Sequence, residues 1–199
     1  KNKKKNIDNN FLKKINNQYF NTDGNKENLK FILEVAKILK LKKKSLIKTI
    51  NKYKGLKYRQ EIIFQSKKLT IINDSKATTF SSSVSLLKSL TNVYWIVGGQ
   101  AKRGDKLLLS KKNCKNFKAY IFGNNKSFFI SRIKKLMKYE SFLDLQSVIK
   151  KLSSEVKRNK KTIHKTILFS PSAASFDSFK NFEKRGEYFN QLIKKYINA

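Results

Sequence analysis

The chain of 199 residues has little of two residue types on which much enzyme chemistry depends, with one cysteine and one histidine. A lone Cys114 excludes an internal disulfide framework and fits a reducing compartment. A metal site needs several His, Cys, Asp or Glu ligands together, and a Cys–His dyad needs both residues in one pocket. No such residues cluster in the sequence around Cys114 or His164, so we expect neither a metal site nor a thiol nucleophile.

Long apolar runs are also missing. No stretch of about 18 apolar residues occurs, which excludes a membrane-spanning helix. The Lys- and Asn-rich N-terminus has no apolar stretch behind it, which excludes a secretory signal, so we expect a cytoplasmic protein. Apolar side chains still make up 39% of the chain, enough for a hydrophobic core. The sequence starts without Met, and we expect it to be part of a longer chain.

Acidic residues are scarce: 13 against 46 basic ones, for a net charge of +33. A module that binds nucleic acid or anionic surfaces would explain this balance. However, the lysines are spread over the whole chain, asparagine and isoleucine are also frequent, and arginine is rare, as AT-rich codons would produce. Because a nucleic-acid module usually concentrates charge on one face, we favour the compositional explanation and expect no specific nucleic-acid partner.

The apolar spacing predicts two helices, over 24–41 and 44–55, followed by a change of character near Leu56–Tyr58. Asp23 or Asn25 is available to cap the first helix, and Gly55 is expected to end the second. The stretch 61–74 reads as a β-hairpin, and strands then alternate with helices. This order predicts a Rossmann-like, mostly parallel sheet with helices on both faces. The expected strands are 93–99, 117–123 and 165–170, and the expected helices are 81–90, 126–138, 144–158 and 177–197.

Polar or glycine-rich stretches follow four of the expected strands: "NDSKATTF", "GGQAKRGD", "FGNN" and "SPSAASFD". In open parallel sheets, ligands bind at the carboxyl ends of the strands. Asp74 can accept hydrogen bonds from ribose hydroxyls, and Lys76 offers a compact charge for phosphate or carboxylate. Thr78 and 81–83 can cap the next helix and leave its N–H groups facing an anion. The alternative is an ordinary polar loop with a helix cap.

The second and last of these stretches suggest a carboxylate site. "GGQAKRGD" opens with two glycines that allow close backbone approach and offers the charge of Lys102, although a solvated basic loop would look the same. The small residues at 170–175 would let N–H groups and hydroxyls reach a carboxylate, beside a helix expected to begin near Phe176. In that helix Phe182 falls on the apolar face, which also allows a packing role.

Together, "INDSKAT", "GG…K" and "SPSAASFDSFKNFEKRGEYF" resemble the carboxyl-terminal half of the Mur ligases. The last pattern is specific to the family member that adds D-glutamate. Upstream, "NKENLKFILEVAKIL" and "GLKYRQE" extend the resemblance back to about Gly24. It implies an ATP- and Mg²⁺-dependent ligase that adds D-glutamate to UDP-N-acetylmuramoyl-L-alanine through an acyl phosphate. This reaction belongs to peptidoglycan synthesis, and therefore to cell shape and division.

The resemblance also assigns roles to residues that match the family's motifs. It implies that 1–57 is the incomplete end of the central ATPase domain and that 58–199 is the carboxyl-terminal, D-glutamate-binding domain of a monomer. Lys76 matches a catalytic lysine near the reacting phosphate. The implied nucleotide contacts are Asn28, Arg59 and Asp74, and the implied D-glutamate contacts are Thr78, Lys102, Ser175, Phe176 and Phe182.

Some features depart from the family's pattern. Gly24 and Tyr58 stand where histidines are usual, and Thr79 replaces an asparagine, which affects the expected nucleotide packing. No Gly-x-Gly-Lys-Thr/Ser phosphate loop occurs, and the family's metal ligands and uridine-nucleotide domain are also missing. We expect these parts upstream of Lys1, and we expect this chain alone to be inactive. A non-catalytic basic module and a sister ligase of the folylpolyglutamate type remain the alternatives.

Overall fold

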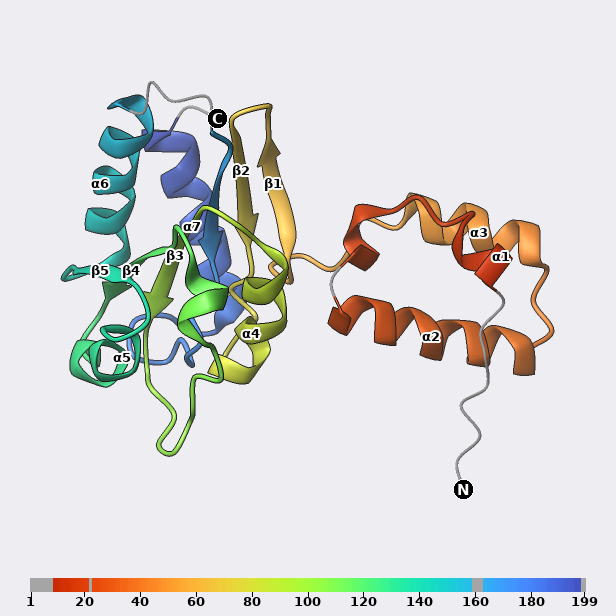
Figure 1. Ribbon diagram of the computed structural model, residues 1–199, viewed down its shortest axis with the longest axis horizontal. Coiled ribbons are helices and arrows are strands. Elements are labelled where there is room, and N and C mark those ends of the chain that lie inside the picture. Colours follow the sequence, from red (N-terminus) through yellow and green to blue (C-terminus); the bar gives the residue numbers. More distant parts are fainter. Residues whose placement is uncertain (1–8, 22, 159–162, 198–199) are drawn as a thin grey trace. The chain divides into compact units, whose positions relative to one another are not determined.

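The computed structural model describes residues 9–21, 23–158 and 163–197 of the chain (Figure 1). It divides the chain into two compact units, Lys1–Gly55 and Leu56–Ala199. Each unit has its own hydrophobic core, and each is described here by itself.

The first unit is helical, with α1 (Asn9–Leu12), a 3-10 turn η1 (Gln18–Asn21), α2 (Asp23–Ile38) and α3 (Lys43–Lys52). Both predicted helices are therefore present. The expected capping residues are wrong: Asp23 and Asn25 lie inside α2, and the side chain of Asn25 donates to Tyr19 O at 2.7 Å. Helix α3 ends before Gly55, with Tyr53 at its C-cap. The small core consists of Phe11, Phe20, Leu29, Leu33 and Ile50.

The second unit is built on a six-stranded sheet in the order β1-β2-β6-β3-β4-β5. Strand β1 pairs antiparallel with β2, and all other neighbours are parallel, so the predicted hairpin and the predicted parallel sheet are both confirmed. The strands are β1 (Glu61–Gln65), β2 (Leu69–Asn73), β3 (Val93–Gly98), β4 (Lys118–Phe122), β5 (Lys138–Ser141) and β6 (Lys165–Phe169).

Helices cover both faces of this sheet (Figure 1), as the sequence predicts. Neighbouring residues of a strand point to opposite faces, so Trp95 packs with α4 (Phe80–Ser89) and α5 (Lys126–Ile133), whereas Ile96 packs with α6 (Leu145–Arg158) and α7 (Phe182–Tyr196). A 3-10 turn, η2 (Lys111–Cys114), lies between β3 and β4.

Two predicted boundaries are wrong. The helix expected over 126–138 ends at Ile133, and Lys138–Ser141 forms the edge strand β5. None of the four β5 side chains is buried, which explains why no apolar pattern marks the strand. The last helix starts at Phe182 rather than near 177, because Asn181 caps it by accepting a hydrogen bond from Lys184 N at 2.8 Å.

Candidate active site at the carboxyl edge of the sheet

The loops that follow β2, β3, β4 and β6 meet at the carboxyl edge of the parallel strands. Gly98 N donates to Pro171 O at 3.0 Å, and Gln100 and Ala174 exchange two backbone hydrogen bonds of 3.0 and 3.1 Å. Ala101 N donates to the side chain of Asn125 at 3.0 Å. Ser170 Oγ donates to the carboxylate of Asp74, so the loop after β2 joins the other three stretches in one surface.

Asp74 lies at the base of this surface, with only 3% of its area exposed. Its carboxylate accepts hydrogen bonds from Gln60 N at 3.1 Å and Ser170 Oγ at 2.8 Å. Burial raises the pKa of Asp74 to about 7, although both hydrogen bonds act in the opposite direction. In this arrangement the carboxylate joins two loops and is not open to a ribose.

The serines of "SPSAAS" also have internal roles. Ser170 and Ser172 each lie 2.6 Å from the hydroxyl of Ser83 on α4, and Ser170 O accepts a hydrogen bond from the Trp95 indole at 2.8 Å. Ser172 adopts φ +57°, a backbone conformation that suits a turn. The small residues thus let the loop after β6 pack against α4 and β3, and Ser175, 3% exposed, is buried with them.

Lys76 and Phe182 are in direct contact. The Lys76 ammonium lies 3.9 Å from the centroid of the Phe182 ring, a cation–π arrangement. The backbone of each residue is also fixed: Lys76 N donates to Tyr58 O at 2.9 Å, and Phe182 O accepts from Ser75 Oγ at 2.8 Å. Phe182 is half-buried at the start of α7 and is in neither apolar core cluster of this unit. The packing interpretation of Phe182 is therefore the weaker one.

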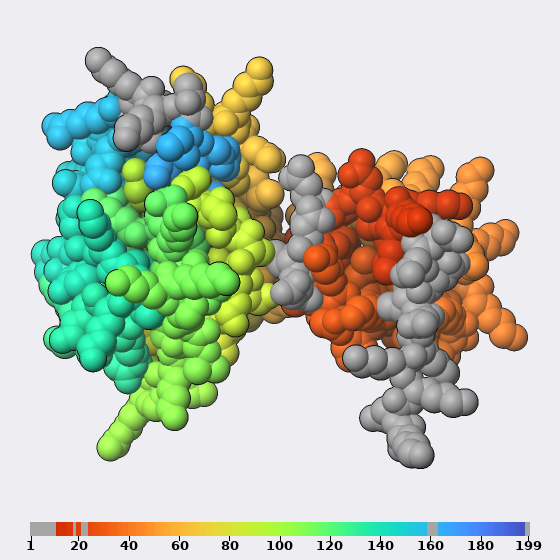
Figure 2. Space-filling view, in the orientation of Figure 1, coloured from red at the N-terminus to blue at the C-terminus, as the bar shows by residue number. Residues whose placement is uncertain are grey.

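Thr78 and Lys102 lie on loops that meet at the start of α4. Thr79, not Thr78 or a residue of 81–83, caps α4 by accepting a hydrogen bond from Ser82 N at 3.4 Å. Phe80 N, at the first position of α4, donates to the carboxylate of Asp105 at 2.7 Å. This bond attaches the loop of Lys102 to this helix end. Lys102 is exposed and Thr78 half-buried. The loop after β3 projects from its unit (Figure 2).

The other three predicted residues are exposed. Phe176 is 71% exposed in the turn after Ser175, where the backbone rather than a helix end is available. Arg59 is exposed between Tyr58 and Gln60, both of which have positive φ. Asn28 is exposed on α2 of the first unit.

One residue that the sequence did not single out is Arg185 on α7, whose side chain is fully buried beneath these loops. It falls inside the quoted stretch "FEKRGEYF", but a basic residue attracts no notice in a chain with 46 of them. Its only local signal is its place on the helix: Phe182, Arg185 and Phe189 recur at three- and four-residue steps, so Arg185 interrupts the apolar face.

Within the described residues, no group of three His, Cys, Asp or Glu side chains lies together as a metal site would require. No step is therefore assigned to a metal held by the described residues. In the same part of the chain, no helix is long and apolar enough to cross a membrane.

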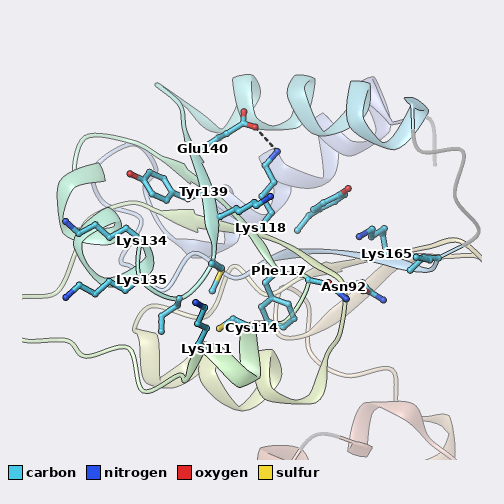
Figure 3. Close-up of a pocket in the computed structure, with 16 residues that line it drawn as sticks. Asn92, Lys111, Cys114, Phe117, Lys118, Lys134, Lys135, Tyr139, Glu140 and Lys165 are labelled. Carbon is cyan, nitrogen blue, oxygen red and sulfur yellow. Dashed lines mark ion pairs between the residues drawn. The ribbon is translucent and has the colours of Figure 1, made fainter.

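A depression of about 1300 Å³ lies at the amino ends of β3, β4 and β5, on the opposite edge of the sheet (Figure 3). Lys118, one of its lining residues, forms ion pairs with Glu140 at 2.7 Å and Glu155 at 2.8 Å. The depression contains none of the predicted site residues. It is lined by six lysines: Lys111, Lys118, Lys134, Lys135, Lys138 and Lys165.

The fold is that of known Mur ligases. MurC, a UDP-N-acetylmuramate-alanine ligase from Thermotoga maritima, superimposes on 87% of this chain with a TM-score of 0.56 and 13% identity. MurF from the same organism, solved with ADP, covers 89% with a TM-score of 0.57 and 15% identity. This chain covers 38% and 39% of those two chains. No protein-family model matches the chain.

Sequence similarity points to one branch of these ligases. UDP-N-acetylmuramoylalanine--D-glutamate ligase of Wolbachia from Brugia malayi is 36% identical over 176 residues, which is 88% of this chain and 35% of the relative. The enzymes of that name from Rickettsia felis and Francisella tularensis are 33% and 35% identical over 86% of the chain. The resemblance to Mur ligases is thus confirmed, for a chain that spans 35–41% of these relatives' length.

Proposed function

We propose that this chain is the carboxyl-terminal part of an ATP-dependent ligase that adds D-glutamate to UDP-N-acetylmuramoyl-L-alanine in peptidoglycan precursor synthesis. The observation that supports it most strongly is the similarity, over 88% of the chain, to an enzyme named for this reaction. The meeting of the "DSKAT", "GGQAK" and "SPSAAS" loops at one sheet edge adds independent geometric support.

In this proposal, residues 1–57 end a central ATPase domain and 58–199 form the D-glutamate-binding domain. The surface of α2 supports an incomplete first domain. One face, with Leu29, Leu33 and Ala36, is buried, but Phe31, Val35 and Ile38 are 72%, 53% and 77% exposed on another. An exposed apolar stripe usually marks a contact surface. The remainder of the central domain would cover it.

The proposed reaction has two steps. ATP phosphorylates the carboxylate of the muramoyl-L-alanine substrate, giving an acyl phosphate and ADP. The amine of D-glutamate then attacks the acyl carbon, the amide bond forms, and phosphate leaves. The protein must bring several anions together, and preorganised cations and N–H donors do this without reorganisation during the reaction.

Lys76 is the proposed catalytic cation. Its contact with Phe182 and its backbone bond to Tyr58 limit where the ammonium can go, so it can neutralise charge on the reacting phosphate and carboxylates at little entropic cost. We assign one carboxylate of D-glutamate to Thr78 and Lys102. The other is assigned to Ser175, Phe176 and Phe182, partly through backbone N–H groups.

We assign the adenosine part of ATP to Asn28, Arg59 and Asp74. Because Asp74 accepts from Gln60 N, the residue after Arg59, we propose that it acts largely by fixing the Arg59 turn. The Mg²⁺ that accompanies ATP would be held by the upstream part of the enzyme, as would the phosphates. We propose that the enzyme is a cytoplasmic monomer.

The test is Lys102→Ala in the longer protein that carries this chain, with Lys106→Ala on the same exposed loop as the control. Loss of a charged hydrogen bond of about 1.5–3 kcal/mol should lower kcat/KM for D-glutamate by about 10- to 150-fold. The KM for ATP should stay unchanged, as should both constants in the control. Equal losses for the two substrates, or none, would refute the assignment.

A second measurement addresses the alternatives. The 199-residue chain alone should form no amide bond, because its sequence contains no phosphate loop. If the longer protein instead ligates glutamate to a folate, the sister-ligase interpretation is correct. If it ligates nothing, the D-glutamate ligase proposal fails as a whole.

A further inference from the structure

Arg185 is the most deeply buried charged side chain of the candidate site, with 0% of its area exposed. Its guanidinium donates to Ser75 O at 2.8 Å, to Ser75 Oγ at 3.1 Å and to Ala174 O at 3.1 Å. Burial lowers the pKa of Arg185 to about 10, partly offset by the attraction of Asp177, so the group stays charged at neutral pH. A buried charge is tolerated only where hydrogen bonds compensate for lost water.

Two of the proposed site loops are bonded to this guanidinium, and the third passes close to it. Ser75 immediately precedes Lys76, and Ala174 immediately precedes Ser175. The loop of Lys102 passes close to it at Gly99, where an added Cβ would lie 2.8 Å from Ala174 O and 3.1 Å from Nη1 of Arg185. Gln100 then pairs with Ala174 through two backbone bonds.

Other side chains of α7 pack it onto the sheet. Phe189, Leu192 and Ile193 do that within the apolar cluster, where the Phe169 and Phe189 rings stack 4.4 Å apart. All three hydrogen bonds of the guanidinium go to loop residues instead. A planar fork of donors can hold two loops at a fixed separation, which the single ammonium of lysine cannot do.

We propose that Arg185 is a positioning residue that sets the spacing of the loops carrying Lys76, Lys102 and Ser175, and thereby the distance between the two carboxylate subsites for D-glutamate. The proposal rests on the function proposed above. It predicts that loosening the guanidinium contacts weakens the recognition of D-glutamate and leaves the binding of ATP nearly intact.

The test compares Arg185→Lys with Leu192→Ala in the longer protein. Leu192 lies on the same helix, is 3% exposed, and packs in the apolar cluster. Both variants should melt at lower temperature. Only Arg185→Lys should raise the KM for D-glutamate, by about tenfold or more, while the KM for ATP changes less than about twofold. A similar rise in Leu192→Ala would mean that general destabilisation is the cause, and would overturn the proposal.

Hydrogen exchange on the 199-residue chain gives a readout that is independent of activity. In Arg185→Lys, the amides of Gln100, Ala174 and Lys76 should exchange faster, while those within β2 and β3 stay protected.

If Arg185→Lys does not fold, Ser75→Ala removes one acceptor and should speed the exchange of the same amides by a smaller factor. Unchanged loop amides in the variant that folds would overturn the proposal, as would faster exchange with an unchanged KM for D-glutamate. If the longer protein does not use D-glutamate, the proposed function fails, and the exchange data still decide whether Arg185 holds the loops.

Discussion

At the scale of single residues, Asp74 is the group on which pH acts most directly. Its carboxylate is buried with two hydrogen bonds, and burial raises its pKa to about 7 from an ordinary 3.8. The folded chain therefore keeps a proton on Asp74 over a pH range in which the unfolded chain has released it. Ionisation at neutral pH would place an anion at the base of the loops, beside Ser170 and the Arg59 turn.

The unfolding free energy should consequently fall as pH rises from about 4 to about 7, by about 4 kcal/mol from this group. Below pH 4 the contribution is complete, and above pH 7 it is lost. Asp74→Asn, which cannot titrate, should show a much flatter profile. Urea unfolding at a series of pH values, followed by fluorescence of the single tryptophan, Trp95, in the core of the second unit, would measure this.

The control is Asp144→Asn. Asp144 is exposed and accepts from Ser147 N at 2.7 Å at the start of α6, a position where asparagine caps equally well. With Asp74 intact, this variant should still lose unfolding free energy between about pH 4 and about pH 7. Parallel profiles for Asp74→Asn and the natural chain would show that Asp74 is already ionised in the fold.

At the scale of elements, the start of α7 determines the shape of the site. Asn181 delays the helix to Phe182, so 176–181 form a turn that exposes Phe176 and leaves the Lys76 ammonium over the Phe182 ring. One turn later, Gly186 provides space for Tyr58. A Cβ at 186 would lie 2.4 Å from Cδ1 of that ring. The N–H and the carbonyl of Tyr58 are both hydrogen bonded, so its backbone is fixed and only a turn of the ring could relieve the overlap.

This contact predicts that Gly186→Ala changes the stability of the chain in opposite directions with and without the Tyr58 ring. Gly186→Ala should destabilise the natural chain by about 1–3 kcal/mol through overpacking. In a Tyr58→Ala background, the same change should stabilise the chain by up to about 1 kcal/mol, because alanine is the better helix former. The four urea unfolding curves of this double-mutant cycle measure the coupling. Equal effects of Gly186→Ala in the two backgrounds would show that the ring moves aside.

At the scale of the whole molecule, the net charge of +33 demands an explanation. Six lysines line the depression at the amino edge of the sheet, and Figure 3 shows several of their ammonium groups, but exposed lysines also cover the outer surface of α3. Because both units carry exposed lysines, compositional drift explains the charge better than one dedicated nucleic-acid surface does. Such charge should still attract any polyanion.

We therefore expect binding to single-stranded RNA that is weak near physiological salt. Its strength should not depend on which part of the chain supplies the lysines. Replacing Lys134, Lys135 and Lys138 of the depression by glutamine should lower affinity and the salt dependence of binding as much as replacing Lys44, Lys48 and Lys52 of α3. Fluorescence anisotropy with an unstructured oligonucleotide over a salt series would compare the two triple variants. A much larger loss for the depression set would reveal a true RNA surface there.

Local patterns in the sequence determined most of the fold. The three- and four-residue spacing of Leu29, Leu33 and Ala36 marked α2, and the β-branched runs before Asp74 and Ser170 marked β2 and β6, because periodicity is a property of adjacent residues. Those runs also located the candidate loops. Strand β5 was not predicted, because an exposed edge strand needs no apolar pattern.

Only the tertiary structure decided what the polar residues of the loops contact. No spacing rule brings Asp74 to Ser170 across 96 positions, or Arg185 to Ser75 across 110. These pairings follow from the strand order, in which β6 lies between β2 and β3, and from the need of buried polar groups to find partners. The sequence by itself fixed the elements and the motifs, whereas long-range pairing and burial decided which residues hold the site together and which remain open to a substrate.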